Sequence, residues 1–131
     1  MVFNVVRTAP HELPPAVESQ LELLTLGAED TMYDDLQFAR LYSHGTCVYL
    51  QDDLDIVLSW ALMTPHRYGT KVGFFTRARQ RRKGFARYVL VRLLRDREPG
   101  RVFAKRNDSK SDRLFESLGF ARRKVLYVLP C

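Results

Sequence analysis

Three short apolar runs lie close together in the middle of the chain, and they constrain the fold more than any other feature. They span residues 45–51, 55–64 and 71–78 and are rich in β-branched and aromatic side chains. Such runs are typical of β-strands, and strands that follow one another closely usually pair. We therefore predict an antiparallel meander of three strands, with Pro65 ending the second strand.

Helical and strand-like patterns surround this meander. Helices are predicted at 13–27, 32–42, 84–98 and 109–119, and further strands at 2–8, 101–106 and 121–130. The run at 101–106 follows a helix, so it is predicted to lie parallel to the strand before that helix. The order of elements indicates an α/β (α+β) chain with a mixed sheet. A length of 131 residues corresponds to one ordinary domain.

The charge is unevenly distributed. The formal net charge is +6, with bases concentrated at 77–87, 92–106 and 122–124 and acids at 27–35 and 51–55. An excess of positive charge favours an anionic partner, which is a nucleic acid, a phosphorylated cofactor or an acidic protein face. The sign of the charge does not choose among these three.

Cysteine usage and hydropathy indicate in which cellular compartment the protein is expected. Cys47 and Cys131 form neither a CxxC pair nor a Cys/His ligand set, so no metal site is expected. Two free thiols are typical of a reducing compartment, and a cytoplasmic protein is expected. No stretch approaches 18 uncharged apolar residues, so no membrane helix is expected. The N-terminal residues read as a first strand, not as a signal peptide.

Residues 81–86, with the sequence RRKGFA, join a strand to a helix. The first turn of a helix leaves backbone N–H groups without partners and carries the positive end of the helix dipole. Gly84 allows a ligand to approach the backbone closely, and Ala86 adds little bulk. This arrangement suits a phosphate group. It is neither a Walker A loop nor a dinucleotide-binding fingerprint, because the glycines and the lysine that those motifs need are missing.

The same six residues resemble the signature Arg/Gln-x-x-Gly-x-Gly/Ala of the GCN5-related N-acetyltransferases (GNAT). Residues 114–120, LFESLGF, are similar to the second signature of that family, LYEKLGF, and lie on the expected helix. The resemblance implies a GNAT-like, mixed and mostly antiparallel sheet of six to seven strands flanked by four helices. It also implies that residues 1–131 form a single acyl-CoA-binding domain.

The resemblance further implies acetyl-CoA as the cofactor. In the family, backbone amides of the first signature hold the pyrophosphate, the edge of the preceding strand binds the pantetheine arm, and an Asn lies near the thiol end. Carried over to this chain, the cofactor-binding residues are Phe75, Thr76, Arg81, Arg82, Lys83, Gly84, Phe85, Ala86 and Asn107. The acceptor pocket is expected from residues 24–35 and from the turn near His66 and Tyr68.

Two positions depart from the family pattern. The tyrosine that commonly protonates the departing thiolate is replaced by Phe115, and residues 71–76 carry no acid or histidine that could act as a general base. General acid–base help is worth about 10²- to 10⁴-fold, so transfer without it is feasible. Tyr33, Tyr68, Tyr88 and Tyr127 are alternative proton donors that the spacing does not rank, and no catalytic residue is nominated.

Three hypotheses follow. The first is an N-acetyltransferase in which an amine attacks acetyl-CoA directly within a ternary complex. The second is a catalytically degenerate protein of the same fold that binds a partner protein. The third, which we expect least, is a basic nucleic-acid-binding module. The acceptor, whether small molecule or protein, is not readable from the sequence, and a homodimer formed through the C-terminal strand is compatible with it.

Overall fold

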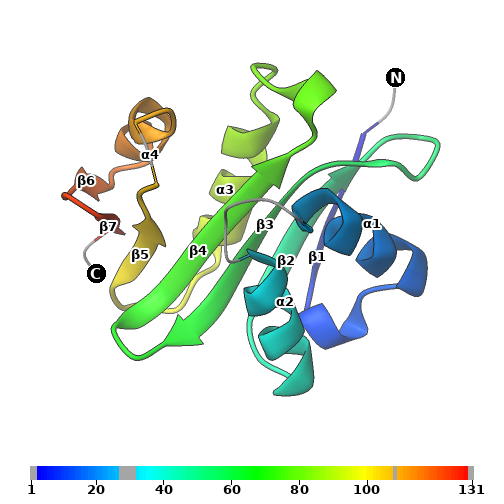
Figure 1. The fold of residues 1–131 in the computed structure, drawn as a ribbon, viewed down its shortest axis with the longest axis horizontal. Helices are drawn as coiled ribbons and strands as arrows, with labels where there is room; N and C mark the ends of the chain where they lie inside the picture. The colour runs from blue at the N-terminus through cyan, green and yellow to red at the C-terminus, as the bar shows by residue number, and fades with distance from the viewer. Residues whose placement is uncertain (1–2, 27–31, 108, 130–131) are drawn as a thin grey trace.

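The computed structural model describes residues 3–26, 32–107 and 109–129. These residues form one seven-stranded sheet with helices on both faces (Figure 1). The strands are β1 (Asn4–Thr8), β2 (Thr46–Gln51), β3 (Val57–His66), β4 (Gly69–Thr76), β5 (Val102–Lys105), β6 (Ala121–Arg122) and β7 (Leu126–Leu129). The α-helices are α1 (Pro15–Thr25), α2 (Met32–Leu41), α3 (Phe85–Arg95) and α4 (Asp112–Ser117), with short 3-10 turns at Pro10–Glu12 and Ala78–Gln80.

The sheet confirms the predicted topology. Its strand order is β1-β2-β3-β4-β5-β7-β6. The first four strands pair in antiparallel order, with β2, β3 and β4 forming the predicted meander, and β5 pairs in parallel with β4 after the crossover through α3. The last two strands form an antiparallel hairpin, and β7 of that hairpin pairs with β5.

The prediction that Pro65 ends its strand was wrong. β3 continues through Pro65 to His66, and Pro65 pairs with Thr70 of β4. Leu58 O accepts a hydrogen bond from Arg77 N, so the even-numbered residues of β3 point their backbone groups at β4. The nitrogen of Pro65 therefore faces away from β4, on the side of β2. Because the pairing with β2 ends at Met63, no ladder hydrogen bond is required of that nitrogen.

Alternation along β2 and β3 supplies two separate cores. Val48, Leu50, Ala61 and Met63 face α3, whereas Cys47, Tyr49, Trp60 and Leu62 face α1 and α2. Successive strand residues point to opposite faces, so a strand covered on both faces reads as a continuous apolar run. Residues 57–64 of β3 are all buried for this reason.

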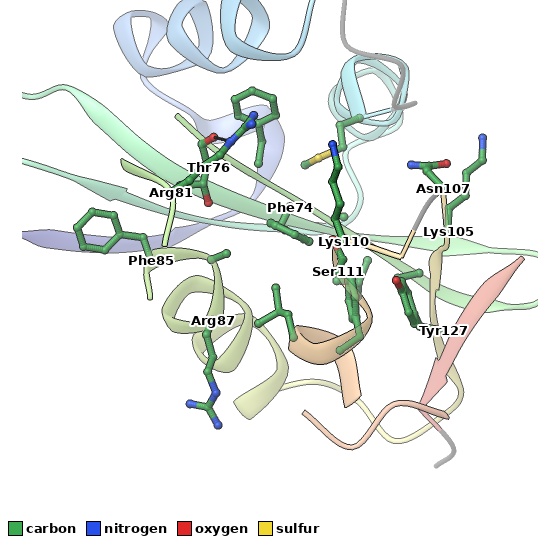
Figure 2. Close-up of a pocket in the computed structure, with 18 of the residues that line it drawn as sticks. Phe74, Thr76, Arg81, Phe85, Arg87, Lys105, Asn107, Lys110, Ser111 and Tyr127 are labelled. Carbon is green, nitrogen blue, oxygen red and sulfur yellow. Dashed lines mark hydrogen bonds between the residues drawn. The ribbon is translucent and has the colours of Figure 1, made fainter. Parts of the chain in front are cut away.

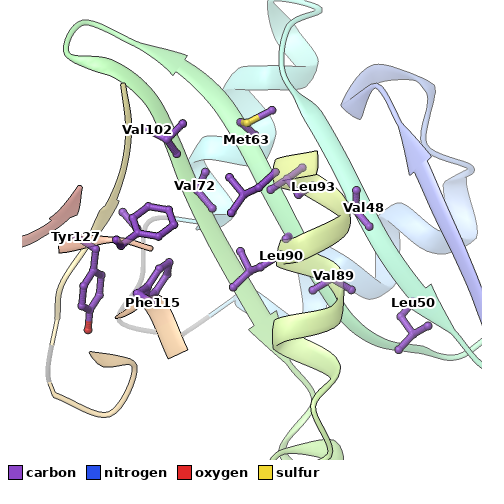
Figure 3. Packing of buried hydrophobic residues seen from close by; sticks show 14 residues of the cluster. Val48, Leu50, Met63, Val72, Val89, Leu90, Leu93, Val102, Phe115 and Tyr127 are labelled. Atoms are coloured by element: carbon purple, nitrogen blue, oxygen red, sulfur yellow. The ribbon is translucent and has the colours of Figure 1, made fainter. Parts of the chain in front are cut away.

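Helix α3 covers one face with a single apolar stripe. Val89, Leu90 and Leu93 have no exposed surface and pack over Val48 and Val72 of the sheet (Figure 3). The spacing of these residues at i, i+1 and i+4 places them on one side of a helix. Among the described residues, no helix is long and apolar enough to cross a bilayer.

Replacement of Leu90 by alanine tests how much this packing contributes. Leu90→Ala removes a fully buried side chain and leaves a cavity, so the free energy of unfolding falls by about 2–5 kcal/mol in urea titrations. Leu41→Ala is the control, because the Leu41 side chain is 74% exposed and its loss changes the unfolding free energy little. Equal effects of the two substitutions would contradict the assigned core.

Candidate functional site

Strands β4 and β5 separate soon after they meet. Their parallel pairing is limited to Thr70 with Val102 and Lys71 with Phe103. Beyond these pairs a cavity of about 800 Å³ opens between the two strands. Its wall draws on both faces of the sheet, from Met32 of α2 to Phe115 of α4. The separation of the two strands therefore produces an opening through the sheet. The side-chain pattern of β4 alone does not predict this opening.

The backbone edge of β4 faces this opening with alternate residues. Ser59 Oγ donates a hydrogen bond to Phe75 O (3.1 Å), which places the backbone groups of Phe75 on the β3 side. Thr70 N donates to Arg101 O (2.9 Å), so even-numbered residues of β4 point toward β5. The edge groups directed into the opening therefore belong to Phe74 and Thr76. Both predicted edge residues, Phe75 and Thr76, line the cavity, and Thr76 is the one whose backbone groups point toward β5.

The start of α3 closes one end of the cavity. Gly84 precedes the helix with φ 81°, and Arg82 has φ 65°. The first helical hydrogen bond runs from Tyr88 N to Gly84 O (3.0 Å), so the N–H groups of residues 85–87 have no acceptor inside the helix. A Cβ atom added to Gly84 would meet no atom within 4 Å. The glycine therefore presents open backbone to the cavity, as the sequence predicted.

Basic side chains surround this helix start. Arg81, Arg82 and Arg87 line the cavity, and the Arg81 guanidinium lies 6.0 Å from the centre of the Phe75 ring. Arg81 Nε also donates to Thr76 O (3.4 Å). Lys83, the remaining predicted base, is not part of the lining and donates to Gln80 Oε1 (3.0 Å). The structure thus brings together all the predicted cofactor residues except Lys83.

The far end of the cavity has an aromatic wall. Phe115 stacks on Tyr127 with ring centres 4.3 Å apart, and Phe74 lies 5.8 Å from Phe115. Asn107 lines the same cavity from the loop between β5 and α4. Figure 2 shows Tyr127 and Asn107 at one end of the cavity and Arg81, Phe85 and Arg87 at the other. The cavity is therefore cationic at its α3 end, and its other end combines these aromatic rings with the basic residues Lys105 and Lys110.

A buried carboxylate holds this wall in place. Asp112 accepts hydrogen bonds from Arg106 Nε (2.9 Å) and Nη2 (3.0 Å), from Arg122 Nη1 (2.8 Å) and from Tyr127 Oη (2.6 Å). We call these four residues the Asp112 clasp. It joins the end of β5 to α4, β6 and β7. The hydrogen bonds from Arg106 and then Tyr127 hold the pKa of the Asp112 carboxyl well below its usual range.

Tyr127 is the one residue among the four candidate tyrosines that lines the cavity. Its hydroxyl already donates to Asp112, at a distance of 2.6 Å. Burial, followed by this hydrogen bond, raises the pKa of Tyr127 to about 12. Tyr127 is therefore a poor replacement for the proton donor that Phe115 lacks.

The α2 side of the opening is lined by Met32, Asp35 and Lys71. Lys71 Nζ and Asp35 Oδ2 form an ion pair at 2.7 Å across the gap between β4 and α2. Residues 27–31 of the predicted acceptor segment lie outside the described residues. His66 and Tyr68, whose turn was predicted to help form the acceptor pocket, do not line this cavity, because their hairpin lies at the end of β4 that is still paired with β5.

Several lining residues were missed from the sequence. Phe74 follows from strand alternation once the edge of β4 is known, because its backbone has the parity of Thr76. Ser111 lies one helical turn before Phe115, and that spacing was available in the sequence. Tyr127 was named among four tyrosines that the sequence could not rank, since it reaches the cavity only through the pairing of β7 with β5. In the described ranges, no cluster of three or more His, Cys, Asp or Glu residues could hold a metal ion.

Seven strands, mostly antiparallel, with four flanking helices constitute the fold of the GCN5-related N-acetyltransferases, which confirms the predicted fold class. No family model matches the sequence, and a search of curated proteins finds no match. Solved structures are similar over nearly the whole chain. An N-acetyltransferase from Staphylococcus aureus Mu50 has a TM-score of 0.74 at 14% identity, covering 99% of both chains.

Two further similar structures were solved with acetyl-CoA. YncA from Salmonella typhimurium has a TM-score of 0.69 at 16% identity, covering 99% of this chain and 94% of YncA. A GNAT phosphinothricin acetyltransferase from Sinorhizobium meliloti has a TM-score of 0.71 at 14% identity, covering 99% of this chain and 89% of that one. At these identities the likeness is one of fold.

The Asp112 clasp makes stability depend on pH in the acid range. Because the folded-state pKa of Asp112 lies below the unfolded value of about 3.9, its contribution is complete above that pH and is lost as the pH falls through the folded-state pKa. Asp112→Asn removes the charge and lowers the melting temperature at pH 7 by roughly 5–10 °C. The melting temperature of this variant also falls less steeply below pH 4 than that of the wild type. Thermal melts from pH 7 to pH 2 measure both effects.

Asp53→Asn is the matched control, because Asp53 is exposed in the turn between β2 and β3. A decline in acid that is equally steep in wild type and in Asp112→Asn would show that the clasp carries no net stability.

Proposed function

We propose that this protein is an acetyl-CoA-dependent N-acetyltransferase and that residues 1–131 act as a single acyl-CoA-binding domain. The observation that carries the proposal is the cavity between β4 and β5, which joins a helix start with free N–H groups to an unpaired strand edge. An elongated molecule with a phosphate group at one end and an amide-containing arm fits these two features together. Acetyl-CoA in two structures of the same fold supports this choice.

Each part of the cavity has a role in this proposal. The backbone N–H groups that follow Gly84 bind the pyrophosphate, and Arg81 and Arg82 add charge. The pantetheine arm adds to the edge of β4 through the backbone groups of Phe74 and Thr76, much as an extra strand would. Phe85 and Ala86 border the phosphate end of the cavity. The arm directs the thioester toward Asn107 and the aromatic wall.

Direct attack by the acceptor amine needs little from the protein beyond positioning. The opening through the sheet gives access from the α2 side, where Met32 and Asp35 lie. Holding two reactants in the correct orientation can supply most of the rate enhancement when the leaving group is a thiolate. Water can take the proton that the amine releases.

A catalytically degenerate protein remains the second candidate. It is favoured by one observation, namely that Phe115 has no proton to donate and the Tyr127 hydroxyl is held by Asp112. The first candidate turns over acetyl-CoA, whereas the second acts by binding a partner protein, with or without acetyl-CoA. Turnover on a broad panel of amines, followed by the release of free thiol, separates them.

The phosphate end can be tested by a charge change at Gly84. Acetyl-CoA binding to the folded state alone contributes about 2.7 kcal/mol at a hundredfold excess over Kd, which raises the melting temperature by roughly 10 °C for a chain of this size. Gly84→Asp abolishes the rise, because its carboxylate repels the pyrophosphate. Gly84→Asn is the matched control, since both side chains tolerate the left-handed backbone but only one is charged.

Retention of the acetyl-CoA effect in Gly84→Asp, with circular dichroism showing a native fold, would place the phosphate elsewhere. No rise for the wild-type protein at millimolar acetyl-CoA would contradict the proposed function itself.

A further inference from the structure

The outer surface of α1 and α2 carries a group of exposed apolar side chains. Five large residues at these two helices have exposed fractions between 55% and 74%, namely Leu23, Leu26, Phe38, Leu41 and Tyr42. We call these five residues the helical patch. At about 200 Å² for a fully exposed side chain of this size, the helical patch presents about 600 Å² of surface, which is at the upper end of what monomeric proteins leave uncovered.

Contacts between the two helices make the helical patch one continuous surface. α1 and α2 contact each other on the same face of the sheet (Figure 1). Gln37 Nε2 donates a hydrogen bond to Glu22 Oε1 (2.7 Å), and Arg40 forms an ion pair with Glu18. The patch residues lie beside these bridges, on the side of each helix that is turned away from the sheet. The helical patch therefore spans both helices.

Each helix is apolar on two sides. α1 buries Val17 and Leu21 and exposes Leu23, and α2 buries Leu36 and exposes Phe38. A surface helix normally carries polar residues opposite its buried stripe, whereas a helix that is apolar all round is normally buried. Packing against the sheet accounts for one stripe of each helix. Within the described ranges no element covers the second stripe, which indicates that another molecule buries it.

The charges around the helical patch favour a second copy of this chain as that molecule. The chain carries a net charge of +6, so two copies repel each other on average. At the helical patch, however, Arg40 is paired with Glu18, and it is the one base of the two helices. A second copy can therefore approach here without an unpaired base at the centre. An anionic lipid surface is a poor occupant, because the two helices contain four acids.

The C-terminal strands offer less to a homodimer. β7, the strand through which a homodimer was considered from the sequence, is paired with β5 on one side and with β6 on the other. The outer strand β6 contains only Ala121 and Arg122. An edge strand this short gives little support to pairing with another chain.

We propose that the helical patch is the interface of a homodimer, in which each copy packs its helical patch against that of the other. Both copies use the same surface, so the contact closes after two chains. Helices that face each other in this way pack the ridges of one into the grooves of the other. A standard interface takes about 800 Å² from each partner. The helical patch falls short of this area, so the dimer is weak, with an expected Kd of about 10–100 µM.

Sedimentation velocity from about 2 µM to about 200 µM tests the proposal, because this range spans the expected Kd. The average mass of the wild-type protein rises from one chain toward two. Leu23→Glu on α1 and Phe38→Glu on α2 each place a charge in the apolar contact of both copies and raise the Kd about tenfold or more. Both side chains are exposed in the single chain and glutamate suits a helix, so circular dichroism shows a native fold.

Leu54→Glu is the matched control. Leu54 is 77% exposed, close to the 74% of Leu23, but it lies in the turn between β2 and β3, away from α2. This variant keeps the wild-type dependence of mass on concentration. Added sodium chloride at about 1 M leaves the wild-type dimer intact, whereas it would dissociate a dimer held by attraction between the acidic turn and the basic loop.

The outcomes decide between the helical patch and other contacts. A wild-type protein that keeps the mass of one chain at about 200 µM overturns the proposal. Binding of such a single chain to phosphatidylcholine vesicles or to another protein, if lost in Leu23→Glu, would assign the patch to that occupant and likewise overturn it. A dimer that persists in both patch variants, or that salt dissociates, forms elsewhere and also contradicts it.

The dimer and the proposed function fail separately. None of the five patch residues lines the cavity between β4 and β5. The acetyl-CoA thermal shift is therefore expected to be the same in wild type, Leu23→Glu, Phe38→Glu and Leu54→Glu. A shift that is lost in the patch variants would show that the patch acts through acetyl-CoA binding, which contradicts an interface independent of the cavity.

Discussion

The short pairing between β4 and β5 is the constraint on which the rest of the structure depends. Two residue pairs join the strands at Thr70 and Lys71. Beyond them β4 keeps its partner β3 but, among the described residues, has no strand paired with its other edge. An unpaired strand edge inside a domain must be satisfied by some other group, since buried backbone donors and acceptors are costly when left unpaired. The cavity that follows is thus a consequence of strand geometry. The start of α3 and the basic loop before it lie at one end of this cavity.

Separation of two strands would weaken the sheet unless the outer strands were held independently. The Asp112 clasp provides this support, because one carboxylate receives hydrogen bonds from residues of β6 and β7 and from the end of β5. Phe115 and Tyr127 then stack to form the wall of the cavity. The same interaction withdraws the Tyr127 hydroxyl from acid–base chemistry. The hydrogen bond between Tyr127 and Asp112 therefore both supports the outer strands and occupies the phenol at this wall.

Local patterns predicted most of the fold and the glycine-opened, cationic start of α3. The strand and helix assignments, the parallel placement of β5 and the exposed backbone at Gly84 all follow from alternation, helix periodicity and the conformational freedom of glycine. The continuation of β3 through Pro65 was missed, because tolerance of a proline at that position depends on where the neighbouring strand β2 stops. The role of Phe74 was missed for a related reason, since which residues of β4 face the opening depends on their pairing with β3.

The sequence by itself determined the order of elements, the two apolar faces of the sheet and the cationic helix start, because these arise from residues that are neighbours along the chain. Only the tertiary structure decided where β4 and β5 part and that Asp112 holds Tyr127. These features depend on contacts between segments that are distant in sequence or on the register of strands. Local secondary-structure preference does not predict such contacts, because a residue can form them only after the rest of the fold has placed its partner beside it.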